Sequence, residues 1–140
     1  MKLSKKTDYA LRSLCYLAAE DRKEYISIRA LSEANDIPYR FLQQIVLDLK
    51  QHGWIITQPG RDGGLRLARP ADAITVGEVV RVFDGVLAPI GCVSITNYEA
   101  CSQETTCLFR PLLLEVRNYT ADLLDRTTLR DLIDNKTKVE

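Results

Sequence analysis

Three of the chain's four cysteines, Cys92, Cys101 and Cys107, fall within sixteen residues of one another. Thiolates are soft, anionic ligands that suit iron and iron–sulfur clusters. A short segment brings them together at little entropic cost, whereas distant ligands must be gathered by the fold. In a reducing compartment such a group more often binds metal or undergoes redox chemistry than forms a disulfide framework. These cysteines are therefore the first candidates for a functional site.

Two interpretations of the three cysteines stay open. Cys92, Cys101 and Cys107 either hold an iron–sulfur cluster or are partly buried or redox-paired thiols without metal. Cys15 lies inside an apolar helical pattern, where a free cysteine behaves as a small core residue. His52, the only histidine, is remote in sequence from the other cysteines and is a poor ligand candidate.

The clustered cysteines belong to a long segment without periodicity and to the helix that follows it. Residues 85–106 hold glycine, proline and two of the three cysteines, and long loops within compact domains are usually functional. Apolar residues then recur at helical spacing from Leu108 to about Arg126, with Pro111 tolerated in the first turn. A lone helix of this length needs a partner, so we expect a homodimer.

Upstream of the loop, the pattern predicts three helices. They span Ser4 to Glu20, the segment from Ile28 that Ser27 can cap, and a third from about Pro38 to His52. Two short helices joined by a tight turn, the second bearing Arg, Gln and Tyr, describe a helix-turn-helix. The expected buried stripe of the third helix is Phe41, Leu42, Ile45, Val46 and Leu49.

A β-hairpin is predicted directly after the third helix. Residues 54–57 and 65–68 have extended patterns, and the turn between them contains glycines, a proline and Arg61. Such a basic hairpin is typical of a wing that lies along the sugar-phosphate backbone. A further helix is expected from Thr75 to Phe83, with Thr75 and Glu78 forming a capping box.

These elements predict a mainly α fold with a small β-hairpin wing, that is, a winged helix-turn-helix followed by a long C-terminal dimerisation helix. We expect a DNA-binding domain at residues 1–84, a cysteine-bearing loop at 85–107, and the dimerisation helix with a tail at 108–140. The N-terminal residues lead directly into an amphipathic pattern, and no apolar run approaches the roughly 18 residues needed to cross a bilayer. We therefore expect a protein without a leader that stays in the cytoplasm.

Charge and side-chain type favour double-stranded DNA as the partner. Residues 1–70 carry twelve Lys and Arg against eight Asp and Glu, and residues 71–140 carry seven against eleven. On the third helix, Arg40 is suited to guanine and Gln43 and Gln44 to adenine. Other basic and tyrosine side chains suit phosphate or carry the wing's charge. The full candidate set is Lys5, Tyr39, Arg40, Gln43, Gln44, Arg61 and Arg66.

Four stretches together resemble the Rrf2 family of winged-helix regulators, in particular its iron–sulfur members of the NsrR, RirA and IscR types. They are MKLSKKTDYALRSLCYLA, IPYRFLQQIVLDLKQHGWI, GRDGGLRLARPADAITVGEVV and the three-cysteine loop. The resemblance implies a homodimer in which the long helix crosses its twin. It also implies a [4Fe-4S] or [2Fe-2S] cluster held by Cys92, Cys101 and Cys107, with Asp8 of the other subunit completing the coordination.

The chain departs from the family pattern at several positions. Eight residues separate Cys92 from Cys101, a wider spacing that is closer to RirA-like members, and no histidine follows Cys107 as in IscR-like members. In the wing, Pro59 stands where many relatives have arginine and Leu65 where some have tyrosine. The subfamily is therefore left open.

The expected function is DNA-binding transcriptional regulation, with the chain acting as a repressor on a palindromic operator. Operator binding would be controlled by an iron–sulfur cluster that senses nitric oxide, redox state or iron. The alternative is a cluster-free winged-helix repressor controlled by thiol oxidation or by a partner protein. The sequence shows no nucleophile–base pairing, phosphate-binding glycine loop or paired-carboxylate motif, so an enzyme is not expected.

Overall fold

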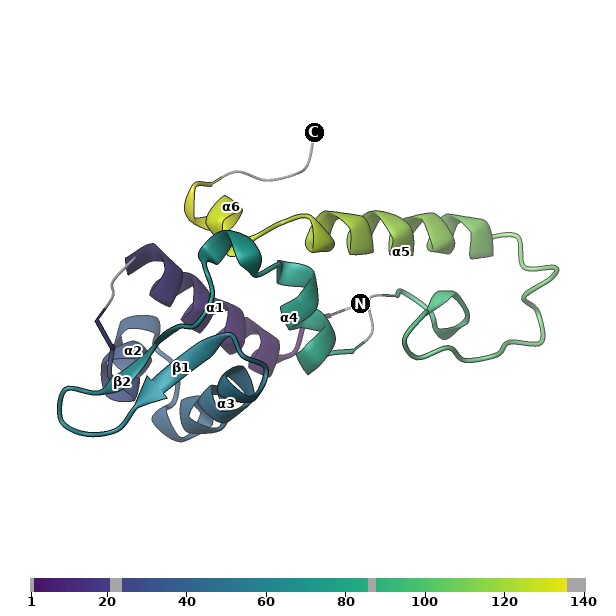
Figure 1. The fold of residues 1–140 in the computed structure, drawn as a ribbon. Coiled ribbons are helices and arrows are strands. Elements are labelled where there is room, and N and C mark those ends of the chain that lie inside the picture. Colours follow the sequence, from purple (N-terminus) through teal and green to yellow (C-terminus); the bar gives the residue numbers. More distant parts are fainter. Residues whose placement is uncertain (1, 21–23, 86–87, 136–140) are drawn as a thin grey trace.

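The computed structural model describes residues 2–20, 24–85 and 88–135. It is mainly helical with one two-stranded antiparallel sheet, which confirms the predicted fold class (Figure 1). In chain order the elements are α1 (Lys5–Glu20), α2 (Ile28–Asn35), α3 (Tyr39–Gln51), β1 (Ile55–Gln58), β2 (Gly64–Leu67), the 3-10 turn η1 (Ala71–Ala73), α4 (Val76–Phe83), the 3-10 turn η2 (Gly91–Val93), α5 (Arg110–Asp125) and α6 (Leu129–Ile133).

Helix α1 is the centre of what we call the helical domain, which comprises α1 to α4, the hairpin and α6. It packs against α2, α3, α4 and α6. Leu14 of α1, Leu31 of α2 and Ile45 of α3 are fully buried in one core, which also takes in Leu129 of α6. Because α1 touches the other helices of this domain, any displacement of α1 is felt by the rest.

The turn between α2 and α3 is set by local signals in the sequence. The Ser27 hydroxyl accepts a hydrogen bond from the backbone N–H of Ala30 at 3.1 Å and so caps α2, as predicted. Asp36 ends α2 with φ at 50°, a left-handed conformation that aspartate tolerates. Pro38 precedes the first residue of α3, and its fixed φ suits that place.

Two sequence predictions differ from the structure in detail. Phe41 was expected in the buried stripe of α3 but is 38% exposed, because its ring lies at the edge of the core and meets the Tyr9 ring edge-on at 5.3 Å. The Thr75 hydroxyl does accept from the Glu78 N–H at 3.2 Å. The Glu78 carboxylate, however, accepts from Trp54 Nε1 at 2.7 Å instead of closing a reciprocal capping box.

The hairpin is fastened to the segment before α2. Its strands pair in antiparallel register, with Ile55 opposite Leu67. Leu65 and Ile26 exchange two backbone hydrogen bonds at 2.8 and 2.9 Å. Gly64 makes this approach possible, since its φ is 144° and an added Cβ would lie 2.1 Å from the Ile26 carbonyl oxygen. The wing is therefore held against the helix-turn-helix.

Helix α5 extends away from the helical domain, and the segment that carries the cysteines lies at its far end (Figure 1). All sixteen residues of α5 are described, and none of them is buried. After α5 the chain returns, because Thr128 pairs with Thr75 and Leu129 is fully buried. The expected domain boundaries at residues 85 and 108 stay a prediction, and residues 136–140 of the expected tail lie outside the described residues.

Candidate DNA-binding face and cysteine pocket

The solvent side of α3 carries the side chains that sequence analysis assigned to base contact. Arg40, Gln43 and Gln44 are exposed, and the buried residues of the helix lie on its other side. Tyr39 begins the helix half-buried, and the Arg29 guanidinium lies 4.8 Å from its ring centroid. Side chains of this kind and exposure can reach base edges and phosphates in a major groove.

The wing brings more positive charge beside the helix-turn-helix. Arg61 is exposed at the tip, and Arg66 lies half-buried with its guanidinium 4.7 Å from the Tyr25 ring centroid. The tip and the segment before α2 line a hollow of about 530 Å³, formed by Glu24, Tyr25, Ser27, Arg61, Asp62 and Gly63. Lys5 is exposed on α1, with its ammonium 5.9 Å from the Tyr9 ring centroid.

Arg29 and Tyr25 were missed by sequence analysis. Arg29 lies in the first turn of α2, where the helix dipole disfavours a cation. A cation at this unfavourable position indicates a contact with another group, and the Arg29 guanidinium does contact the Tyr39 ring. Tyr25 belongs to a segment without periodicity, so only the fold reveals that it supports Arg66.

The three clustered cysteines share a single pocket of about 450 Å³ at the start of α5. Cys92 lies in η2 and is 7% exposed, Cys101 is exposed and Cys107 is half-buried. The pocket is lined mainly by apolar side chains from the cysteine loop, which we define as residues 88–109, and from the first turns of α5. Its lining residues are Ile90, Cys92, Cys101, Gln103, Glu104, Cys107, Leu108, Phe109, Arg110 and Leu113.

Two charged residues of this pocket are fixed by hydrogen bonds. Glu104 accepts from the Cys101 backbone N–H at 3.2 Å and from the Tyr98 hydroxyl. The hydrogen bond from Tyr98 lowers the pKa of Glu104 and raises that of Tyr98, so Glu104 remains a carboxylate. The Arg110 guanidinium donates to the Cys92 carbonyl at 3.0 Å. Glu104 of the loop and Arg110 of α5 thus place negative and positive charge beside the thiols.

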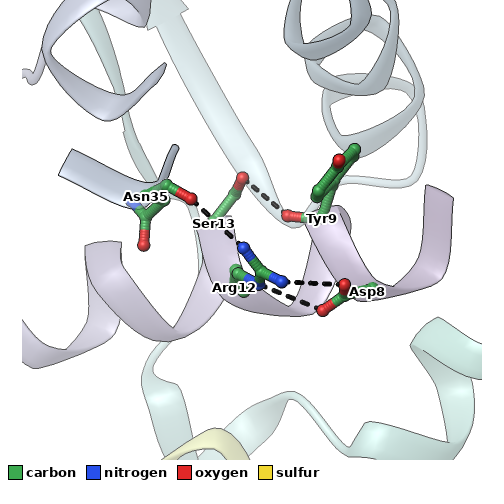
Figure 2. Close-up of polar contacts among 5 residues, drawn as sticks. All are labelled: Asp8, Tyr9, Arg12, Ser13 and Asn35. Carbon is green, nitrogen blue, oxygen red and sulfur yellow. Dashed lines mark hydrogen bonds and ion pairs between the residues drawn. The ribbon is translucent and has the colours of Figure 1, made fainter. Parts of the chain in front are cut away.

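Asp8, the remaining predicted ligand, lines a different hollow. It faces an open groove of about 750 Å³ along α1, together with Leu11, Arg12 and Cys15. Figure 2 shows its two carboxylate oxygens accepting from Arg12 Nε and Nη2, at 3.1 and 2.9 Å. Arg12 also donates to the backbone carbonyl of Asn35 at the end of α2. Within one chain, therefore, Asp8 is not among the residues that line the cysteine pocket.

Among the residues that the structure describes, no three His, Cys, Asp or Glu side chains are close enough to bind one metal ion together. In a [4Fe-4S] cluster each ligand binds a different iron, whereas in a [2Fe-2S] cluster two ligands share each iron. Burial raises the pKa of Cys15, which keeps that thiol protonated and unreactive, as its place against the core predicts.

A helix-turn-helix with a two-stranded wing and basic side chains on both defines a winged-helix DNA-binding protein. A family model described as Rrf2, iron-dependent transcriptional regulator, matches residues 3–135. The chain belongs to the Rrf2 family. Proteins of this family are transcriptional regulators that bind DNA and are not enzymes.

Individual relatives agree with this assignment. The transcriptional regulator NsrR of Bacillus subtilis is 35% identical over 139 residues, which cover 99% of this chain and 94% of that protein. Among solved structures, CymR, the global cysteine regulator of B. subtilis, matches with a TM-score of 0.80 at 27% identity, covering 97% of this chain and 98% of that one. The oxidized form of Staphylococcus aureus CymR matches with a TM-score of 0.76 at 29% identity, covering 96% and 97%.

The described part of the chain has no helix that is both long and apolar enough to cross a membrane.

Proposed function

We propose that the protein is a homodimeric, cytoplasmic repressor whose affinity for its operator is set by an iron–sulfur cluster held by Cys92, Cys101 and Cys107. The observation that carries the proposal is that all three cysteines line one pocket, although eight residues separate the first two. The similarity to NsrR over nearly the whole chain supports it.

The residues of the pocket fit such a group. Three thiols supply soft ligands, apolar walls limit the access of water, and Arg110 supplies a positive charge beside ligands that become anionic on binding. When bound, a cluster supplies iron–thiolate bonds that nitric oxide, oxidants or loss of iron can break. The exposed Cys101 gives such reagents a route to the site.

Asp8 of the partner subunit would provide the fourth ligand. Its groove is open, so another chain can reach it, but its carboxylate must first leave Arg12. That ion pair is exposed and therefore contributes little stability, so exchanging it is easy. Arg12 also donates to the Asn35 carbonyl at the end of α2 (Figure 2). If Arg12 moved away from this carbonyl when Asp8 leaves it, the contact between α1 and α2 would loosen.

The exposed apolar side chains of α5 support dimerisation with a second copy of this chain. Leu112 and Tyr119 are 61% and 56% exposed, and Phe109 before the helix is 59% exposed. A helix with such a stripe needs cover, and a twofold pair of α5 helices would provide it without any other protein. Two recognition helices would then meet successive major grooves about 34 Å apart on a palindromic site.

On the DNA, each subunit would use α3 for bases and the wing and α1 for phosphates. Arg40, Gln43 and Gln44 are the base-contacting residues of the proposal. Contacts with phosphates come from Lys5, Tyr39, Arg61 and Arg66. The exposure or half-exposure of all seven side chains is consistent with these roles.

The proposal is tested on protein purified without air, by its absorption spectrum, its iron and sulfide content, and its affinity for an operator fragment. Wild type and the control Cys15→Ala are expected to be brown and to contain iron, because Cys15 packs against the core. Cys101→Ala is expected to lose both the colour and the tight operator binding. Wild-type protein that never contains iron would overturn the proposal, and unchanged DNA binding without the chromophore would refute the coupling.

The second candidate is a cluster-free repressor controlled by thiol oxidation. The exposure of Cys101 and the similarity to CymR favour it. Here oxidation of wild type without iron would change its operator affinity, and reduction with dithiothreitol would restore it. The same titration on iron-loaded protein and on protein stripped of iron distinguishes the two candidates, because only the first predicts different affinities for the two reduced forms.

A further inference from the structure

The end of α4 is fastened to the first turn of α1. Asp84, which ends α4, accepts a hydrogen bond from the Thr7 hydroxyl at 2.7 Å. It also accepts from the backbone N–H of Ser4, at 3.2 and 3.3 Å from its two carboxylate oxygens. Thr7 is fully buried, and Asp84 is the acceptor for its hydroxyl, which itself accepts from the Ser4 hydroxyl at 3.3 Å. Asp84 thereby fixes the start of α1 from a distance of almost eighty residues in the sequence.

The next residue, Gly85, is held by the cysteine loop. The Gly85 carbonyl accepts a hydrogen bond from the Thr96 hydroxyl at 2.5 Å. Thr96 lies between Cys92 and Cys101 in sequence, and it lines a small hollow of about 180 Å³ that also includes Arg81 of α4. Asp84 and Gly85 are thus bound by different regions of the molecule, although only one peptide bond separates them.

The first turns of α1 contact the recognition helix α3. Lys6 Nζ lies 2.9 Å from Asp48 Oδ2, and the Tyr9 ring packs edge-on against Phe41 at 5.3 Å. Both residues flank Thr7, which Asp84 holds. A shift of this part of α1 therefore moves the side chains on which α3 rests, and packed helices respond to such shifts as rigid bodies.

We infer that Asp84 is a positioning residue that transmits the state of the cysteine loop to the recognition helix within one subunit. The route runs from Thr96 through Gly85 and Asp84 to Thr7, and from α1 to α3. It rests on the proposed function, since the thiols must change state for anything to be transmitted. It is distinct from the route through Asp8, which requires the partner subunit.

The experiment measures operator dissociation constants for the iron-loaded dimer and for the same dimer stripped of iron. In wild type their ratio is expected to be about 5- to 150-fold, the usual size of coupling between sites. In Asp84→Ala this ratio is expected to fall below about threefold, because the contact between Asp84 and Thr7 is lost. The iron content is expected to stay unchanged. Asp72→Ala, which removes an exposed carboxylate from η1, is the matched control and keeps the wild-type ratio.

Because Asp84→Ala also removes contacts that hold α1, the ratio is measured for Thr7→Val and Asp84→Asn as well. Thr7→Val keeps the shape of the buried side chain but lacks the donor, and a reduced ratio is expected. Asp84→Asn keeps an acceptor oxygen for Thr7, and partial recovery is expected. A full wild-type ratio in both Asp84→Ala and Thr7→Val, or loss of iron from both, would overturn the role of Asp84 while the proposed function stands. A wild-type ratio of one would overturn both.

Discussion

The apolar residues of the helical domain are mostly buried, whereas those of helix α5 are exposed or half-buried. In α3, Leu42, Ile45 and Leu49 are fully buried by other parts of the same chain. In α5, Leu112 and Tyr119 remain more than half exposed, although the helix is longer. Isolated helices are marginal in water, and most of their stability comes from covering an apolar face. The apolar face of α3 is therefore covered within one chain, and that of α5 is not.

The polar contacts of the helical domain and of the cysteine loop also differ, in how far apart in the sequence their partners lie. In the helical domain, Glu78 links Trp54 to Arg69, so residues distant in sequence lock one another. In the cysteine loop, Glu104 accepts hydrogen bonds from the Tyr98 hydroxyl and the Cys101 backbone, both close to it in the sequence. The DNA-binding face is therefore built on a fixed core, whereas the thiols lie on a segment that is organised locally.

The largest expected effect is on the core beneath the recognition helix. Leu42→Ala removes a fully buried side chain from α3 and is expected to lower the free energy of unfolding by about 2 to 5 kcal/mol. Leu47→Ala is the control on the same helix, since Leu47 is 67% exposed, and a change within about 0.5 kcal/mol is expected. Urea denaturation of both variants measures the difference. Equal losses would show that α3 is not supported by this core.

The second prediction concerns the face of α5. Leu112→Glu places a charge where the proposed dimer buries a leucine, and dissociation of the dimer is expected to become easier by about 2 to 3 kcal/mol, roughly 30- to 150-fold. Sedimentation equilibrium measures the dissociation constant, and Glu33→Gln, at an exposed position of α2, is the control. Wild-type protein that stays monomeric at high concentration, or a Leu112→Glu dimer as tight as wild type, would contradict the contrast between α3 and α5.

Sequence analysis succeeded where the signal was local. The Ser27 cap, the buried stripe from Leu42 to Leu49 and the hairpin each depend on residues close together in the chain, so periodicity and turn chemistry indicate them. The ion pair of Asp8 with Arg12 has the i, i+4 spacing that favours such pairs on a helix, and it could have been predicted too.

The features that sequence analysis missed depend on tertiary contacts, which leave no pattern in the local sequence. Nothing in the local sequence predicts that Asp84 holds the start of α1, because its partners Ser4 and Thr7 are nearly eighty residues away. Phe41 has the spacing of a core residue, and only the packing of α1 shows that it lies at the edge. The apolar stripe of α5 looks the same in sequence whether its cover comes from this chain or from another.

The third prediction separates two kinds of contact on the DNA-binding face. Arg40→Ala on α3 is expected to weaken operator binding by about 1 to 3 kcal/mol and to relax the preference for one base pair. Arg61→Ala at the wing tip is expected to weaken binding to all sequences and to reduce the slope of log affinity against log salt by about one. Fluorescence anisotropy over a salt series measures both, with Arg126→Ala, directly after α5, as the control. Identical salt slopes for Arg40→Ala and Arg61→Ala would remove the distinction between α3 and the wing.

The smallest expected effect lies at Asp84, where the helical domain meets the cysteine loop. Burial raises the pKa of Asp84, but hydrogen bonds from Thr7 and Ser4 outweigh burial and hold the pKa below its ordinary value. A carboxyl group with a lowered folded-state pKa stabilises the fold above its unfolded pKa of about 3.9, and this stability is lost as the pH falls through the lower folded value. The melting temperature of wild type should therefore exceed that of Asp84→Asn most at pH 6, and the two should converge as the pH falls below about 4. Asp72→Asn is expected to follow wild type at every pH, because Asp72 lies exposed on η1. A gap between wild type and Asp84→Asn that stays constant down to pH 3 would mean that the charge of Asp84 does not hold α1, and that the two regions are joined at this point by packing alone.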